Sequence, residues 1–218
     1  KIINNKLFMY HNRLAINDLS LDGTQPMINN NIIIIVNGEI YNYTSLYEDI
    51  KLKLPEYKFQ SKSDSEILIP LYLLYGTQFI KYLKGMYSFI LYDINNDRLI
   101  ASRDHIGIVS MYYLQENDLI IFASEMKAII DIHKDNNVKI FKPGSVFINN
   151  EFYNSYMPSW KDMNYLPNNK YNKEELNMRL TNAVLSHTLS DVPIGILLSG
   201  GLDSSLIASI MCKLKKDK

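Results

Sequence analysis

The feature that most constrains this chain is the string SGGLDSS at residues 199–205, which stands between a short apolar run and an amphipathic stretch. The run 194–198 predicts a buried strand, and residues 203–216 predict a helix. Two adjacent glycines leave backbone N–H groups open to an anion, and the new helix points its positive end at the same place. With a further helix predicted from Lys173 to about Ser190, this order begins an α/β nucleotide-binding sheet.

The hydroxyl groups of this loop add donors that suit a pyrophosphate. Asp203 would repel phosphate unless Mg²⁺ bridges the two. A helix cap with glycines for tight packing is the alternative. The string resembles the pyrophosphate loop of the ATP-pyrophosphatase superfamily, so ATP is implied as a cosubstrate. The candidate ATP-binding residues are Leu197, Leu198, Ser199, Gly200, Gly201, Asp203, Ser204 and Ser205, with Asp203 as the candidate magnesium ligand.

The first 150 residues have a different character and predict a sheet-rich α+β domain. Apolar or alternating runs predict strands at 7–10, 32–36, 86–92 and 98–102, and a hairpin at 112–114 and 119–123. A helix is predicted over 64–75, with Ser63 as its cap, Glu66 at the capping-box spacing and Gly76 as its end, and a second helix over 124–131. Residues 151–172 carry Pro, Asn and Tyr without a period and predict an interdomain linker.

Polar strings follow several of these elements. Asn37-Gly38 is expected to form a turn directly after the apolar strand. Asp64 has a simple interpretation as part of a helix start, and Arg13 as a strand-edge side chain. A structural ion pair is the preferred interpretation of Arg103 and Asp104, and Glu125 and Lys127 are also expected to be structural.

In their order along the chain, these strings resemble the class II glutamine amidotransferase domain of the asparagine synthetase family. The resemblance rests on HNRLAINDLS…QPM, VNGEIYNY, SDSE, LKGMYSFILYD, RDHIGIVSMYY, ASEMKA and SDVPIGILLSGGLDSS, spread over residues 8–211. It implies an N-terminal-nucleophile hydrolase fold, an αββα sandwich over 1–150, and the start of an ATP-pyrophosphatase domain over 173–218. The implied parent activity is ATP-dependent conversion of aspartate to asparagine with ammonia from glutamine.

The resemblance also implies the roles of individual residues. Arg13 would bind the α-carboxylate of glutamine, because a guanidinium fork suits it, and Asp64 would hold the α-ammonium. Asn37 and Gly38 would supply oxyanion-hole donors. The other residues expected to line this glutamine pocket are Leu14, Ala15, Ile16, Asn17 and Glu39.

The sequence departs from the family in several places. The family's nucleophile is a cysteine at the mature amino terminus, whereas residue 1 is lysine and the chain's single cysteine, Cys212, lies in the second unit. We therefore expect this chain, as a fragment, neither to hydrolyse glutamine by itself nor to be very stable. Lys62 replaces the family's usual glycine, and Ala15 and Asn17 replace commoner residues. A β-lactam-synthetase-like enzyme and a non-catalytic glutamine-binding remnant are the alternatives.

Composition adds the remaining expectations. Lys plus Arg and Asp plus Glu are equal at 23 each, which argues against nucleic-acid binding. The sequence has no apolar run of transmembrane length. A single cysteine fits a reducing compartment, so a cytoplasmic location is expected. The resemblance further suggests a homodimer.

Overall fold

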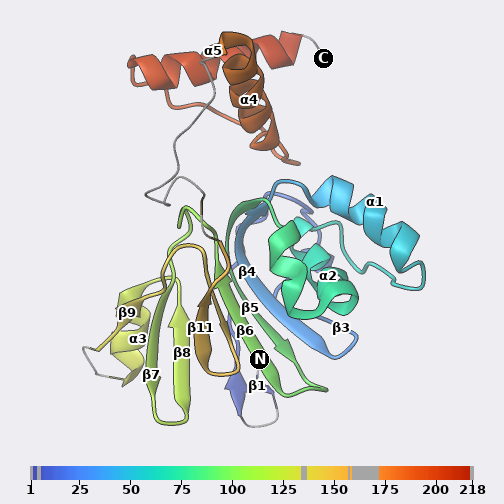
Figure 1. Cartoon of the computed structure of the whole chain (residues 1–218), viewed down its shortest axis with the longest axis vertical. Coiled ribbons are helices and arrows are strands. Elements are labelled where there is room, and N and C mark those ends of the chain that lie inside the picture. Colours follow the sequence, from blue (N-terminus) through green and yellow to red (C-terminus); the bar gives the residue numbers. More distant parts are fainter. Residues whose placement is uncertain (1, 4–5, 134–136, 157, 159–171, 217–218) are drawn as a thin grey trace.

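The centre of the structure, a computed structural model that describes residues 2–3, 6–133, 137–156, 158 and 172–216, is a six-stranded antiparallel sheet. Its strand order is β11-β10-β6-β5-β4-β3 (Figure 1). A second sheet has the order β8-β7-β9, and β1 and β2 form a small separate pair. The strands are β1 Ile2–Ile3, β2 Leu7–Phe8, β3 Met27–Asn29, β4 Ile32–Ile40, β5 Gly85–Asp93, β6 Arg98–Arg103, β7 Tyr112–Glu116, β8 Leu119–Ala123, β9 Lys139–Ile140, β10 Ser145–Ile148 and β11 Glu151–Asn154.

The first half of strand β4, residues 32–36, contributes to the cores on both faces of the sheet, which explains its unbroken apolar sequence. Ile32, Ile34 and Val36 belong to one hydrophobic cluster, whereas Ile33 belongs to another. Successive side chains of a strand point to opposite faces, so β4 can contribute to two cores at once. Its neighbour β5 alternates in the same way, and the two strands pair from Ile32–Asp93 to Ile40–Gly85.

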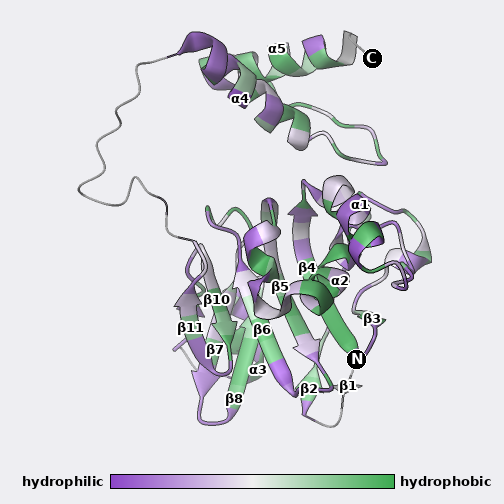
Figure 2. Cartoon of the chain, turned by 45° about the vertical axis from the view of Figure 1, so that its right-hand side comes forward, coloured by the Kyte–Doolittle hydropathy of each residue, from purple (hydrophilic) through white to green (hydrophobic). Residues whose placement is uncertain are grey.

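The two cores define a layered αββα sandwich. The first lies between the large sheet and the helices α1 (Tyr43–Lys53) and α2 (Leu68–Tyr75), together with the 3₁₀ segments η2 (Asp64–Ile67) and η3 (Gly76–Tyr82). The second lies between the two sheets, and α3 (Met126–His133) packs on β7 and β8. A further 3₁₀ segment, η1, spans Leu21–Gly23. Figure 2 shows the apolar strands in the interior of this sandwich. The predicted fold class is confirmed.

The expected turn at Asn37-Gly38 is wrong. Both residues lie inside β4, where Asn37 pairs with Ser88 and Gly38 with Tyr87. Gly38 has φ +128°, and a Cβ added to it would lie 2.0 Å from the carbonyl oxygen of Met86. The glycine is therefore required by the close approach of β5 within the sheet, and not by a change of chain direction.

The segment expected as one helix over 64–75 begins as η2 and continues as α2. Ser63 caps it, since its Oγ accepts the N–H of Ser65 at 3.3 Å, and Gly76 ends α2 with φ +54°. The predicted capping box is wrong. The carboxylate of Glu66 accepts the N–H groups of Gln60 and Ser61 and does not reach back to the cap residue.

The carboxyl-terminal unit contains α4 (Lys173–Ser186), capped by Asn172, and α5 (Leu202–Lys216), which contacts α4. The expected strand Ile194–Leu198 is wrong: this segment has no regular secondary structure and pairs with no strand among the described residues. A strand needs a hydrogen-bonded neighbour. The boundary expected at 150 is also too early, because residues 151–154 form β11, and residues 159–171 of the expected linker lie outside the described residues.

None of the helices in the described ranges combines the length and the apolarity that a membrane crossing requires.

Replacement of Gly38 by alanine should destabilise the fold strongly. Backbone strain at positive φ costs about 1–3 kcal/mol, and the clash with the backbone of Met86 adds to it. Gly76→Ala is the matched control, because its φ is also positive but an added Cβ meets nothing within 4 Å. Urea unfolding should give a lower midpoint for Gly38→Ala than for Gly76→Ala. Equal midpoints would contradict the close-approach explanation.

Candidate functional site

A cavity of about 230 Å³ opens beside the second half of β4. Its volume is somewhat below the range of about 300–1,000 Å³ for small-molecule sites, which fits an amino acid. Its wall combines segments far apart in sequence: the loop before η1, strand β4, the start of η2 and one residue each from the segment between η1 and β3, from β5 and from a later loop. The lining residues are His11, Asn12, Arg13, Leu14, Ile16, Asn17, Gln25, Val36, Asn37, Gly38, Glu39, Ser63, Asp64, Ser65, Met86 and Val109.

The structure thus brings together the residues predicted for a glutamine pocket, with one exception. Ala15 does not line the cavity, whereas Leu14 and Ile16 on either side of it do. Leu14 is 83% exposed and lies at the rim. Several other lining residues, among them His11 and Met86, were not predicted from the sequence.

Arg13 is held by its own loop. Its Nη1 donates to the carbonyl oxygen of Ser20 at 2.9 Å, and its Nη2 donates to the carbonyls of Asn17 and Asp18. A guanidinium has five N–H donors, so these three bonds leave two for a ligand. The loop carbonyls fix the orientation of the side chain, and the remaining donors and the positive charge are available in the cavity wall.

Asp64 is almost completely buried, at 4% exposure. Its Oδ2 accepts the N–H of Ile40 at 2.7 Å, and the side chain of Asn17 also donates to it. Burial raises the pKa of Asp64, although these hydrogen bonds act in the opposite direction. A buried carboxylate whose pKa is raised favours a bound cation, because a nearby positive charge stabilises its ionised form.

Glu39 is a second acid in the same cavity wall. Burial raises the pKa of Glu39, and the negative charge of Asp64 raises it further. Two carboxyls in one wall, both with raised pKa values, give this end of the cavity an affinity for positive charge. Arg13 is the one Lys or Arg among the lining residues. The cavity therefore carries both signs of charge that an α-amino acid requires.

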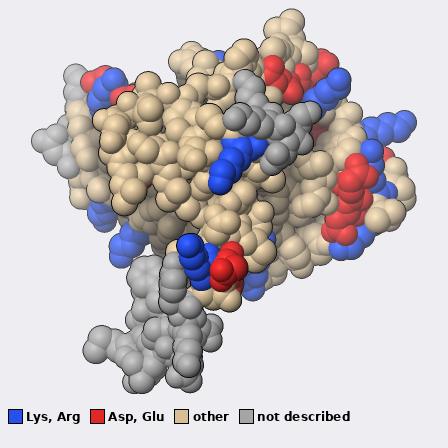
Figure 3. Space-filling view, turned by 90° about the horizontal axis from the view of Figure 1, so that it is seen from above, with Lys and Arg blue, Asp and Glu red and all other residues tan. Residues whose placement is uncertain are grey.

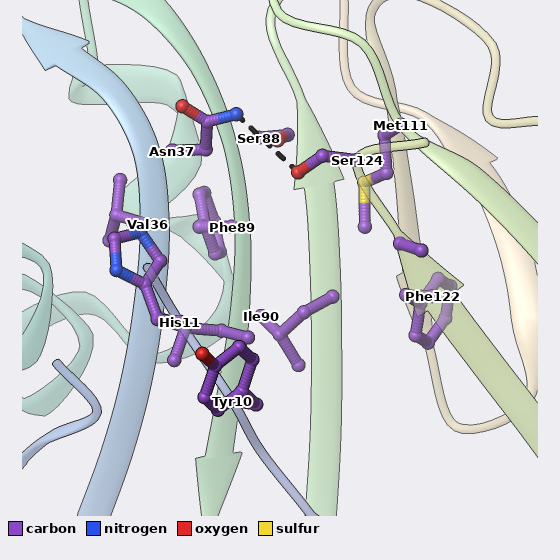
Figure 4. Close-up of a pocket in the computed structure, with 12 residues that line it drawn as sticks. Tyr10, His11, Val36, Asn37, Ser88, Phe89, Ile90, Met111, Phe122 and Ser124 are labelled. Atoms are coloured by element: carbon purple, nitrogen blue, oxygen red, sulfur yellow. Dashed lines mark hydrogen bonds between the residues drawn. The ribbon is translucent and has the colours of Figure 1, made fainter. Parts of the chain in front are cut away.

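Asn37 lies where this cavity meets a second one of about 100 Å³ between the two sheets. Figure 4 shows its amide directed at Ser124, to whose Oγ it donates at 3.4 Å. This bond is long, and Asn37 is exposed, so its amide N–H₂ is accessible for another acceptor. The position of Asn37 between two cavities permits the predicted role as a donor to an oxyanion, and that role stays a prediction.

Two further residues organise the cavity without having been predicted. The side-chain amide of Gln25 donates to the carbonyl of Val36 at 3.1 Å and accepts its N–H at 2.6 Å, so it binds the backbone of β4 like a short strand. Asp18, at 5% exposure, accepts the N–H of Lys62 at 2.8 Å. The signal available in the sequence was an acidic residue directly after the string RLAIN.

The expected ion pair of Arg103 and Asp104 is wrong. Arg103 donates to the carbonyls of Gly107, Val109 and Phe141. Asp104, completely buried, accepts backbone N–H groups of the following loop and of β5, including those of Ile106, Gly107, Ile108, Val109 and Tyr87. Both side chains are therefore structural, but they are satisfied by the backbone and not by each other.

Residues 199–201 form an open turn, and residues 202–205 are the first residues of α5. Gly200 has φ +82° with nothing within 4 Å of an added Cβ, and the Oγ atoms of Ser199 and Ser204 lie 2.9 Å apart. Asp203 and Leu197 are exposed, the latter at 96%. The predicted residues Leu198, Gly201 and Ser205 are exposed as well. Within the part of the chain that the structure describes, the N-terminus of α5 is therefore accessible to an anion.

The surface seen from above carries small mixed groups of Lys or Arg with Asp or Glu, and no broad field of one sign (Figure 3). Ion pairs such as Lys53–Asp49 and Lys127–Glu125, both at 2.8 Å, contribute to this mixture. Glu125 and Lys127 therefore pair with each other at the surface, as structural side chains do.

The layered αββα architecture is that of the N-terminal-nucleophile amidotransferases. Two solved structures share the fold: the glutamine phosphoribosylpyrophosphate amidotransferase of B. subtilis complexed with ADP and GMP, and an allosteric regulatory enzyme of purine biosynthesis. Their TM-scores are 0.55 and 0.56 at 23% and 24% identity. Each match covers 68% of this chain and 34% or 35% of the other.

The glutamine amidotransferase domain model matches residues 1–182, so the chain belongs to that family. The asparagine synthase model matches residues 175–218. A probable glutamine-hydrolysing asparagine synthetase of Schizosaccharomyces pombe is 37% identical over 98% of this chain and 38% of its own length. Asparagine synthetase B of Escherichia coli is 39% identical over 93% of this chain and 36% of its own length. The chain thus spans somewhat over one third of these curated relatives.

Relative to the wild type, Glu39→Gln should have a higher free energy of unfolding at neutral pH than at acidic pH. The pKa of Glu39 is raised in the folded state, so the wild type loses stability as pH rises from about 4 through the folded pKa. The glutamine variant lacks this penalty. Urea unfolding at pH 4 and pH 7 should show an advantage of Glu39→Gln that grows with pH. Glu56→Gln, at an exposed position, is the control and should show no such growth.

Proposed function

We propose that this chain is the glutamine-binding part of a glutamine-hydrolysing asparagine synthetase, joined to the first phosphate-binding loop of its ATP-using domain. The observation that carries the proposal is the convergence of Arg13, Asp64 and Asn37 on one cavity of about 230 Å³. These residues come from the loop before η1, from η2 and from β4, so the fold and not the local sequence assembles them.

Glutamine fits the cavity with its two charged groups at separate places. Its α-carboxylate would bind the free N–H donors of Arg13, and its α-ammonium would lie at Asp64, with Glu39 adding negative potential. The side-chain amide would then extend toward Asn37 and Gly38. There the amide of Asn37 and the backbone N–H of Gly38 would stabilise the oxyanion formed when a nucleophile attacks. The family resemblance predicts that this nucleophile is an amino-terminal cysteine of the complete enzyme.

The second unit supports the ATP-dependent half of the proposal. The loop 199–205 would bind the pyrophosphate of ATP through backbone N–H groups and the hydroxyls of Ser199, Ser204 and Ser205. Asp203 would hold Mg²⁺ together with phosphate oxygens. The described residues contain no group of three metal-binding side chains, so the phosphates would have to complete the coordination. In the complete enzyme, ATP would activate aspartate and ammonia would displace AMP.

The relatives named above favour this proposal over a β-lactam-synthetase-like enzyme, because each is named a glutamine-hydrolysing asparagine synthetase. The cavity residues Arg13 and Asp64 are those that recognise an amino acid. A cytoplasmic location and a homodimer stay predictions from the sequence.

Calorimetric titration of the 218-residue chain with glutamine tests the glutamine half of the proposal. We expect saturable binding, and Asp64→Asn should weaken it by about tenfold to a hundredfold, because a charge-assisted bond of about 1.5–3 kcal/mol is lost. Lys62→Ala removes an exposed side chain two residues away and serves as the control. Absence of binding to the wild type, or an equal affinity of Asp64→Asn, would refute the proposed site.

A further inference from the structure

A buried carboxylate links the two sides of the amino-acid cavity. Oδ1 of Asp18 accepts the N–H of Ser20 at 3.0 Å and the hydroxyl of Ser20 at 2.6 Å. Its Oδ2 accepts the N–H of Lys62 at 2.8 Å, across 44 residues of sequence. One oxygen therefore holds the loop that carries Arg13, and the other holds the segment that leads into Asp64.

The Arg13 side of this link is direct. The carbonyl of Asp18 accepts Nη2 of Arg13, and the carbonyl of Ser20 accepts Nη1. Asp18 itself has φ +59°, which is rare for a residue other than glycine. Its side-chain bonds to Ser20 support that conformation and keep both carbonyls aimed at the guanidinium. If the carboxylate released Ser20, the orientation of Arg13 would lose its support.

The Asp64 side is held equally closely. The segment Gln60–Ser63 has each of its backbone N–H groups bound by a side-chain oxygen: Gln60 and Ser61 donate to Glu66, Lys62 donates to Asp18, and Ser63 donates to Oγ of Ser61. Glu66 lies in the same helix start as Asp64. The bond from Lys62 is thus the one among these four that ties the segment to the Arg13 loop.

We propose that Asp18 is the positioning residue that fixes the separation between the carboxylate-binding Arg13 and the ammonium-binding Asp64, and so gives the cavity its selectivity for an α-amino acid that carries both charges. This inference rests on the proposed glutamine site. Hydrogen bonds from Ser20 and Lys62, with the charge of Arg13, lower the pKa of Asp18 despite the opposing effect of burial. The carboxylate is therefore ionised at neutral pH and accepts from both sides at once.

The substitution Asp18→Asn breaks one side of the link and keeps the size of the side chain. Asparagine has one acceptor oxygen and an NH₂ donor, so its NH₂ must face the donors of either Ser20 or Lys62. Asp22→Asn is the matched control, because it makes the same chemical change at an exposed position of η1, directly after the loop.

The experiment compares three ligands by calorimetry: glutamine, 4-aminobutanamide, which lacks the α-carboxylate, and glutaramic acid, which lacks the α-amino group. In Asp18→Asn we expect glutamine to lose about tenfold or more in affinity. Glutaramic acid, which binds through Arg13 alone, should lose less than glutamine, and 4-aminobutanamide, which does not use Arg13, should change least. Asp22→Asn should keep wild-type values. An unchanged glutamine affinity in Asp18→Asn, or an equal loss for all three ligands, would overturn the inference.

A measurement on the wild type keeps the test independent of the variant's folding. Glutamine should slow amide hydrogen exchange at Ser20 and Lys62, because a ligand that bridges both sides tightens the link. Unchanged exchange rates of these two amides at saturating glutamine would contradict the positioning role of Asp18. Failure of the wild type to bind glutamine at all would instead refute the proposed site, which separates the two outcomes.

Discussion

The pairing of β4 with β5 is the interaction on which the rest of the molecule depends. The two strands pair along nine residues each, and each contributes to the cores on both faces of the large sheet. Their apolar halves anchor the sandwich. The polar end of β4, from Asn37 to Glu39, stays in the same ladder and opens into the cavity. The cavity residues Asn37 to Glu39 thus lie on a strand whose other half is anchored in two cores, and precise binding requires such a rigid support.

Buried charges in this protein are satisfied mainly by the backbone. Asp18, Glu66 and Asp104 accept backbone N–H groups, and Arg103 donates to carbonyls. Ion pairs such as Lys53–Asp49 lie at the surface. A carboxylate that accepts hydrogen bonds from several backbone N–H groups of a loop fixes the conformation of that loop. The loops around the cavity are irregular, and these carboxylates explain how they can hold side chains in place without regular secondary structure.

Residues in and beside the cavity also contact the carboxyl-terminal unit. The N–H of Asp18 donates to the carboxylate of Asp191 at 2.8 Å, and the N–H of Asp191 donates to the carbonyl of Ile16 at 3.1 Å. The rings of Tyr41 and His187 lie 4.2 Å apart. The segment that leads to the turn at 199–201 is therefore attached, at Asp191, to the loop that holds Arg13.

The sequence by itself determined the classes of structure and the residue types of both sites. The apolar runs of β4 and β5, the hairpin of β7 and β8 and the capped start at Ser63 follow from local pattern, since burial and turn chemistry act on neighbours in sequence. Motif order indicated Arg13, Asn37 and Asp64. Only the tertiary structure decided that Asn37-Gly38 continues a strand. The backbone of Met86, on another strand, lies so close to Gly38 that a side chain would not fit there. The tertiary structure likewise decided that Ile194–Leu198 stays unpaired and that Asp18 spans to Lys62. These features depend on contacts between segments distant in sequence, and the spacing of apolar and polar residues along the chain carries no information about such contacts.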